Sequence, residues 1–269
     1  MTKNTAMSFR VEASAGRPWV VLCNTVGVPH AVFDRLLAEL AGSFSVVCWS
    51  TSLTERDEPA GKPVELTVEE QTAEVTERLK SFGVREFVGV SWCSGTEILY
   101  RLSQHEAFRV LGHCCLNPAF NLGPEGPCSE WERSIEPIFQ VLCDRPEVLP
   151  GVSALLGAAA ASATRGGDPS LAFPYSTPER VLGYAAQCLG MKRGRTFEGF
   201  VRSVGPGLYL AGSADEVQPF AVSRTAAQRS GAGFELIDGG HHAMVADLPE
   251  VSARVREYCV AAAALTDGH

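Results

Sequence analysis

The chain of 269 residues has little positive charge, because 23 lysine and arginine residues stand against 31 aspartate and glutamate residues. A formal net charge of −8 argues against nucleic acid or an anionic membrane surface as the main partner. The sequence also lacks an apolar run of about 18 residues, the length that a membrane-spanning helix needs. Residues 1–15 contain no apolar core followed by a small-residue cleavage site, so we expect a cytoplasmic protein.

Motifs for metals and nucleotides are missing too. The sequence has no CxxC pair, no ligand-spaced cluster of histidine and cysteine, no Walker loop and no GxGxxG after a strand. We therefore expect neither a metal nor a cofactor. The nine cysteines are expected to be free thiols, because the chain is long and has no secretory signal. Most stand in apolar runs, where a thiol acts as a small hydrophobic side chain.

Short β-branched runs alternate with amphipathic stretches, which is typical of βαβ units around a mostly parallel sheet. Thr67 and Glu70 form a capping-box pattern that predicts the start of a helix, and Gly83 predicts its end. Strands are expected over residues 8–13, 19–23, 45–49, 86–90, 110–116, 208–211 and 234–237.

The alternation stops between residues 118 and 204, where no clear strand is predicted. Helical fragments over residues 131–141, 152–161 and 178–189 are separated by glycine and proline. An insertion of this length in a compact domain commonly has its own structure and acts as a lid. We therefore expect residues 118–204 to form a helical cap on an α/β core made of residues 1–117 and 205–269.

Residues 84–96 (VREFVGVSWCSGT) predict a strand that runs through small residues directly into a helix. Such a junction presents a nucleophile on a tight turn if the residues two before and two after it are small. Ser91, between Gly89 and Cys93, meets this condition, and so does Cys93, between Ser91 and Gly95. We favour Cys93, because it leaves a strand of normal length and puts Gly95 where the helix crosses the sheet. Alternatively, both are ordinary turn and core residues.

The partners of a nucleophile at such a turn follow in the chain order acid, then histidine. Asp215 lies at the end of a turn that follows a predicted strand (LYLAGSAD). His241 comes directly after two glycines that follow another predicted strand. We expect Asp215 to orient His241, and His241 to activate Cys93. The rivals are His242 for the histidine, and Asp238 or Glu216 for the acid.

An oxyanion hole needs two backbone N–H donors, one after the nucleophile and one from the loop after an earlier strand. Ser94 and Val26 are the candidates. The alternative for residues 24–29 (NTVGVP) is an ordinary turn between a strand and a helix.

The order of cysteine turn, helical insertion, aspartate turn and Gly-Gly-His resembles the α/β-hydrolase fold over residues 8–264. This resemblance implies a mostly parallel central sheet with a helical cap inserted after the sixth strand. More narrowly, residues 24–29, 92–95 (WCSG) and 116–121 (LNPAFN) resemble the Cys-dependent off-loading enzymes of polyketide and polyketide–peptide pathways, including Dieckmann cyclases and thioesterases. In some of these cyclases the acid follows the sixth strand, but residues 117–120 contain no carboxylate, so Asp215 takes that role here.

The narrower resemblance implies release of a β-ketoacyl chain, delivered as a thioester by an acyl or peptidyl carrier protein. Transfer to Cys93 exchanges one thioester for another, and the product keeps its α-protons acidic. An internal enolate can then close a tetramate- or pyridone-like ring by Dieckmann condensation. Attack by water instead makes the protein a thioesterase, or a lactone hydrolase with the same Cys-His-Asp triad. The second alternative is a non-catalytic ligand-binding member of the fold.

Aromatic side chains of the predicted cap are candidates for an acyl pocket, although aromatics in short helices also pack against the sheet. The expected lining comprises Asn24, Trp92, Trp131, Phe139 and Tyr175, with Phe173 and Tyr184 as further cap candidates. The compact basic run of Lys192, Arg193 and Arg195 could dock an acidic carrier protein, or it is a solvated loop. Structural roles are expected for His105, His113, Cys114 and Cys115.

Overall fold

The computed structural model describes residues 7–51, 67–120, 122–123, 126–163, 169–194, 206–242 and 249–265. Its centre is a sheet of seven strands in the order β1-β3-β2-β4-β5-β6-β7. β1 pairs antiparallel with β3, and the remaining neighbours pair in parallel, so the sheet is mostly parallel as predicted. The strands are β1 (Met7–Glu12), β2 (Trp19–Cys23), β3 (Ser45–Thr51), β4 (Glu86–Trp92), β5 (Arg109–Leu116), β6 (Gly207–Gly212) and β7 (Gly233–Ile237).

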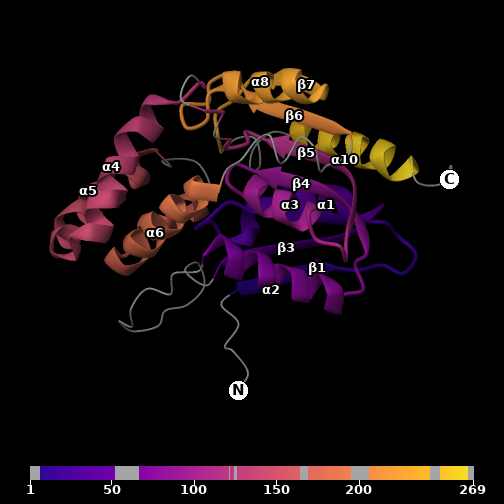
Figure 1. The fold of residues 1–269 in the computed structure, drawn as a ribbon, viewed down its shortest axis with the longest axis horizontal. Helices are drawn as coiled ribbons and strands as arrows, with labels where there is room; N and C mark the ends of the chain where they lie inside the picture. The colour runs from indigo at the N-terminus through magenta and orange to yellow at the C-terminus, as the bar shows by residue number, and fades with distance from the viewer. Residues whose placement is uncertain are drawn as a thin grey trace.

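Helices cover both faces of this sheet (Figure 1). A short 3₁₀ turn, η1 (His30–Phe33), leads into α1 (Asp34–Ala41), which packs on one face together with α10 (Pro249–Ala264). The other face carries α2 (Val68–Ser81), α3 (Gly95–Ser103) and α8 (Phe220–Ser230). Both faces of β2 are thus buried, which explains its unbroken apolar sequence.

The capping box predicted from the sequence is confirmed at the start of α2. The Thr67 hydroxyl accepts a hydrogen bond from the Glu70 N–H at 3.1 Å, and the Glu70 carboxylate accepts one from the Thr67 N–H at 3.0 Å. Gly83 lies just beyond the helix with a φ of 79°, a left-handed conformation that glycine adopts without strain. In contrast, α8 was not predicted, because its buried face consists mainly of small residues that give a weak periodic signal.

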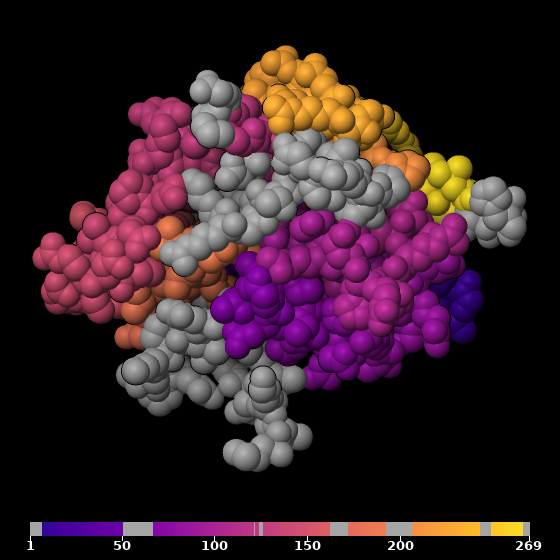
Figure 2. Space-filling model, in the orientation of Figure 1, coloured from indigo at the N-terminus to yellow at the C-terminus, as the bar shows by residue number. Residues whose placement is uncertain are grey.

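The described residues between β5 and β6 form mainly helices, as predicted, and these helices lie to one side of the sheet (Figure 1). It contains α4 (Glu130–Asp144), η3 (Pro146–Val148), α5 (Leu149–Ala163), η4 (Pro169–Tyr175) and α6 (Pro178–Gly194). Figure 2 shows the pink α4–α5 region beside the purple core, with orange α6 between them. These helices share a small apolar cluster made of Phe139, Leu142, Val181, Ala185 and Leu189. We call residues 130–194 the cap helices.

The position of this insertion in the chain differs from the expected one. The insertion follows β5, and in the described part of the chain five strands precede it, whereas the resemblance implied a place after the sixth strand. The side chains of the basic run Lys192, Arg193 and Arg195 lie outside the described part of the structure.

Across the residues that are described, no helix is long and apolar enough to cross a membrane.

Candidate active site

Cys93 lies on the turn between β4 and α3, with a φ of 50°. A left-handed conformation is unfavourable for a residue with a side chain, so the surrounding structure must hold it in place. The Cys93 N–H donates to the carbonyl of Leu116 at 3.0 Å, and the Cys93 carbonyl accepts from the Ala119 N–H at 3.2 Å. The turn has the geometry of a nucleophile elbow, which exposes one side chain above the end of the sheet.

Glycine is required beside this turn because α3 crosses very close to β2. A Cβ atom on Gly95 would lie 2.1 Å from the carbonyl oxygen of Cys23. No side chain fits at that distance, and the obstacle is backbone that cannot move aside. The small residue expected two positions after Cys93 is therefore needed for packing.

Ser91, the alternative nucleophile, is fully buried in β4. Its hydroxyl lies 2.9 Å from that of Thr96 and donates to the Cys115 sulfur at 3.4 Å. Both contacts stay inside the core, and Ser91 does not line the cavity described below. Of the two registers considered, the structure puts Cys93 on the exposed turn.

The remaining thiols have other environments. All nine cysteines are free, and those on the strands and on α10 are buried. Burial raises the pKa of the Cys115 thiol to about 12 and that of Cys259 to about 12, which keeps both protonated. Cys114 and Cys115 are core residues, as expected, whereas Cys93 is only partly buried and lines the cavity.

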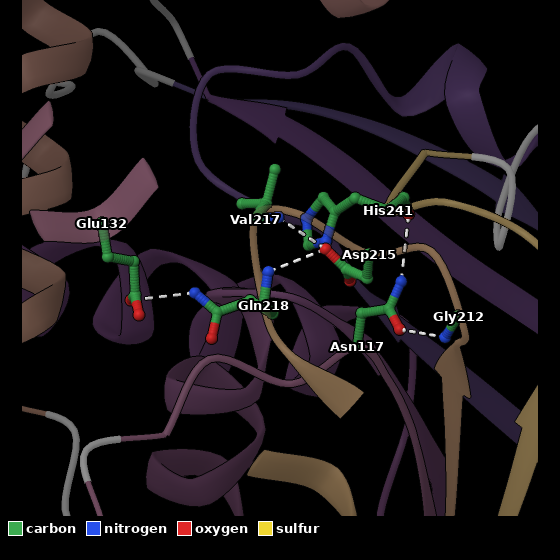
Figure 3. Close-up of polar contacts among 7 residues, drawn as sticks. All are labelled: Asn117, Glu132, Gly212, Asp215, Val217, Gln218 and His241. Carbon is green, nitrogen blue, oxygen red and sulfur yellow. Dashed lines mark hydrogen bonds and ion pairs between the residues drawn. The ribbon is translucent and has the colours of Figure 1, made fainter. Parts of the chain in front are cut away.

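His241 and Asp215 come together at the end of the sheet (Figure 3), and both line the same cavity as Cys93. The Asp215 Oδ2 atom lies 2.7 Å from His241 Nδ1, and the carboxylate is fully buried. Its other oxygen, Oδ1, accepts from the backbone N–H groups of Val217 at 2.8 Å and Gln218 at 2.7 Å. The imidazole also forms a side-chain hydrogen bond with Cys93. The three residues thus form a connected chain from carboxylate to sulfur.

The electrostatics of His241 reflect these neighbours. Burial lowers its pKa, but the negative charge of Cys93 and the hydrogen bonds to Asp215 and Cys93 outweigh burial and raise it to about 10. A histidine with this pKa stays protonated near neutral pH. An imidazolium beside a cysteine favours the thiolate, which is the nucleophilic form of the sulfur.

The rival residues occupy other positions. His242 is exposed, and its ring lies edge-on to that of His241 at 5.2 Å between centroids. Among the described hydrogen bonds, the histidine partner of Asp215 is His241. Asp238 accepts a hydrogen bond from the exposed Ser213 hydroxyl at 3.1 Å. Glu216 lines the cavity, but its neighbour Asp215 holds the histidine.

Asn117 was not predicted as a site residue, yet its buried side chain joins the ends of two strands to the histidine loop (Figure 3). Its Oδ1 accepts from the Gly212 N–H at 2.8 Å, and its Nδ2 donates to the His241 carbonyl at 3.2 Å. Its φ of 43° is left-handed, which asparagine tolerates better than most residues. A polar residue directly after the carboxyl end of β5 was the signal that could have identified it.

The loop after β2 contains Val26, one of the two expected oxyanion donors, and the other, Ser94, follows Cys93. The Val26 N–H donates to the Ser94 hydroxyl at 3.2 Å, which joins this loop to the residue after Cys93. Asn24, expected to bind substrate, instead braces the loop: its Nδ2 donates to the carbonyls of Val28 at 2.7 Å and Trp49 at 3.1 Å. Because these contacts use the buried amide, Asn24 does not line the cavity, and that prediction is wrong.

A cavity of about 1090 Å³ lies between the core and the cap helices, and Cys93, Asp215 and His241 all line it. Its walls include four aromatic residues expected there, Trp92, Trp131, Phe139 and Tyr175, and also Tyr184. Phe173 does not line it, and the Arg180 guanidinium lies over its ring, 3.9 Å from the centroid. The described lining also contains Glu130, Glu132, Glu136 and Glu216 but no lysine or arginine.

A contact between cap and core was also missed by sequence reasoning. Gln218 Nε2 donates to the Glu132 carboxylate of α4 at 2.9 Å, and Gln218 is the residue whose backbone N–H supports Asp215 (Figure 3). The two residues are 86 positions apart, and no local pattern connects them.

The described residues contain no group of three or more histidine, cysteine or acidic side chains arranged to hold a metal. His105 and His113 lie outside the cavity lining: His105 accepts from the Ala107 N–H, and the His113 ring packs on Tyr209.

No model of a known protein family matches the chain, and no curated protein sequence matches it either. Solved structures do match over nearly its whole length. An enol-lactonase from Burkholderia xenovorans LB400 is 19% identical, with a TM-score of 0.70 over 96% of each chain. A thermophilic esterase from Thermogutta terrifontis is 18% identical, with a TM-score of 0.72 over 95% of this chain and 93% of that one. The esterase RhEst1 from Rhodococcus sp. ECU1013 is 20% identical, with a TM-score of 0.69 over 94% of each chain. These neighbours are hydrolases that share one architecture, and the chain accordingly has the α/β-hydrolase fold.

Proposed function

We propose that this protein is a cysteine-dependent acyl hydrolase that acts on thioesters or on activated esters such as enol esters and lactones. The observation that carries the proposal is the connected chain Asp215–His241–Cys93, with Cys93 on the strained turn facing the cavity. The enol-lactonase and the two esterases that share this fold are hydrolases, which supports the same proposal.

The chemistry proceeds in two balanced steps. The Cys93 thiolate attacks the acyl carbon, the bond to the leaving group breaks, and the leaving thiol, alcohol or enol takes the proton of His241. Water then attacks the acyl-Cys93 carbon and gives a proton to His241, and the acid leaves as the thiolate is restored. Asp215 keeps the imidazole oriented through both steps.

The choice of sulfur restricts the substrate. An acyl-cysteine is itself a thioester, so its formation from a thioester is nearly thermoneutral, whereas its formation from an ordinary ester or amide is uphill. The cavity adds a second restriction, because several carboxylates line it and no described lysine or arginine does. An anionic acyl chain would be repelled there, so we favour a neutral acyl group of substantial size.

Ring closure is the second candidate. The same acyl-Cys93 intermediate retains acidic α-protons, and a cavity of about 1090 Å³ has room for a β-ketoacyl chain to fold back on its own thioester. Dieckmann-type release of a chain delivered by an acyl or peptidyl carrier protein therefore remains a proposal that rests on the cysteine and the cavity. The known structures reported above support the hydrolytic outcome better.

The test is intact-mass analysis after incubation with a β-ketoacyl aminoacyl thioester mimic, comparing wild type with Cys93→Ala and Ser91→Ala. We expect an acyl adduct and a free acid that need Cys93 but not Ser91. A ring product in place of the acid would select the cyclase. If wild-type Cys93 forms no adduct and the variants behave alike, the protein is a non-catalytic member of the fold.

A further inference from the structure

The Ser94 hydroxyl occupies an unusual position beside the candidate nucleophile. The Val26 N–H, the expected second oxyanion donor, already donates to Ser94 Oγ at 3.2 Å. An N–H that points at Ser94 Oγ cannot point fully at a substrate oxygen as well. The Ser94 side chain therefore lies in the direction in which an oxyanion hole built from Val26 would hold its anion.

The hydroxyl groups of Ser94 and Thr25 have one proton more than their mutual hydrogen bond uses. Ser94 Oγ lies 2.7 Å from Thr25 Oγ1, so one hydroxyl donates to the other and uses one of their two protons. Neither hydroxyl has a further hydrogen-bonding partner among the described residues. One O–H of the pair is therefore left to donate to a third group. Thr25, Ser94 and Cys93 all line the same cavity, so that donor is available to a group bound in the cavity that Cys93 faces.

The pair is also held in place before any ligand arrives. The Thr25 N–H donates to Asn24 Oδ1 at 2.8 Å, and the Asn24 amide is itself fixed by the carbonyls of Val28 and Trp49. Ser94 is buried at the first turn of α3, and Gly95 presses that turn against β2. Donors held in advance stabilise a developing charge best, because little has to reorganise during the reaction.

We propose that the Ser94 hydroxyl is a side-chain donor of the oxyanion hole. It accepts hydrogen bonds from the Val26 N–H and the Thr25 hydroxyl and gives its own proton to the acyl oxygen while that oxygen carries negative charge. Two donors behind it polarise its O–H bond and make it a stronger donor. Thr25 is then a positioning residue that acts through Ser94, and Val26 contributes through the same hydroxyl. The inference rests on the proposed acyl transfer to Cys93.

The experiment compares two reactions of the same sulfur. Acylation of Cys93 by p-nitrophenyl acetate passes through an oxyanion, whereas alkylation by iodoacetamide does not. Both rates are measured on the full chain for wild type, Ser94→Ala, Thr25→Val and Thr25→Ser, with peptide mass mapping to count only Cys93. For Ser94→Ala we expect acylation to slow by about 10²-fold, the loss typical of one oxyanion donor, while alkylation stays within about twofold. Thr25→Val should slow acylation about 10-fold or less, and Thr25→Ser should restore it.

The other outcomes overturn the inference in distinguishable ways. If Ser94→Ala acylates as fast as wild type or faster, the hydroxyl only fills the position beside the Val26 N–H. If acylation and alkylation fall together, Ser94 acts on the thiolate and not on the oxyanion. If wild-type Cys93 is alkylated but never acylated, the proposed acyl transfer fails, and a donor for its oxyanion fails with it. Thr25→Val provides the same comparison should Ser94→Ala not fold.

Discussion

Cys93 combines a strained backbone with a charged neighbour, and each has a cost that the surroundings must offset. A left-handed φ for a residue other than glycine costs about 1–3 kcal/mol. Two backbone hydrogen bonds, to Leu116 and from Ala119, hold the turn in that conformation. The buried imidazolium of His241 is in turn stabilised by the carboxylate and the thiolate on either side of it. The strained backbone and the buried charge thus occur together at Cys93, whose sulfur faces the cavity.

At the residue scale we predict that Cys93→Ala lowers the pKa of His241 from about 10 toward the ordinary value of about 6.5. The negative charge of Cys93 is the largest influence that raises this pKa, and alanine removes it. By linkage, the stability contributed by the raised pKa is complete below pH 6.5 and is lost as the pH rises through 10. NMR titration of the His241 ring in both proteins measures the change.

Ser91→Ala is the matched control for this titration, because Ser91 is two residues from Cys93 and the described hydrogen bonds of its hydroxyl go to Thr96 and Cys115. In the Ser91→Ala variant, the pKa of His241 should be the same as in the wild type. An unchanged His241 pKa in Cys93→Ala would contradict the thiolate–imidazolium pair.

At the scale of elements, the site depends on how the cap helices meet the core. A Cβ atom on Gly27 would lie 2.5 Å from a ring carbon of Tyr184, so α6 packs directly on the loop that contains Val26. On the other side, Glu132 of α4 receives the hydrogen bond from the Gln218 amide. Both contacts hold a cap helix against a loop of the catalytic arrangement.

We predict that Glu132→Ala lowers the free energy of unfolding by about 1–2 kcal/mol, because it leaves the buried Gln218 amide without its acceptor. Glu132→Gln keeps an acceptor oxygen at the same reach and should lose less than about 1 kcal/mol. Denaturant titration of both variants measures the difference. Equal losses would mean that the charge of Glu132, and not the hydrogen bond, stabilises this contact.

At the scale of the whole molecule, the cavity exists only because the cap helices stand over the carboxyl ends of the strands. Leu156 of α5 lines the far wall from the core, whereas its neighbour Leu155 is 74% exposed. The same substitution made at Leu156 and at Leu155 therefore distinguishes the effect of filling the cavity from an effect on the stability of α5.

We predict that Leu156→Trp raises KM for long-chain acyl thioesters by about 10-fold or more and leaves that for acetyl thioesters nearly unchanged, because the larger ring occupies space that only a long chain needs. Leu155→Trp is the control and should alter neither constant. Steady-state kinetics over a series of chain lengths measures the effect. Equal effects on short and long chains would show that the chain does not extend toward α5.

Local patterns were sufficient to predict much of this protein. Unbroken apolar runs predicted the parallel strands, because a strand covered on both faces needs apolar side chains throughout. The capping box at Thr67 predicted where α2 begins, since both of its hydrogen bonds join neighbours in the sequence. Small residues around Cys93 and two glycines before His241 selected those positions, because steric limits on a tight turn act within a few residues.

Contacts between distant segments were decided only by the tertiary structure. Asn24 braces its own loop and does not face the cavity, because its amide reaches the carbonyl of Trp49 on the next strand. Gln218 supports Asp215 and also reaches Glu132 in the cap, and Ser94 receives the Val26 N–H from a loop 68 residues earlier. A hydrogen bond of this kind depends on where folding places two side chains, and periodicity and turn chemistry describe only near neighbours in the chain.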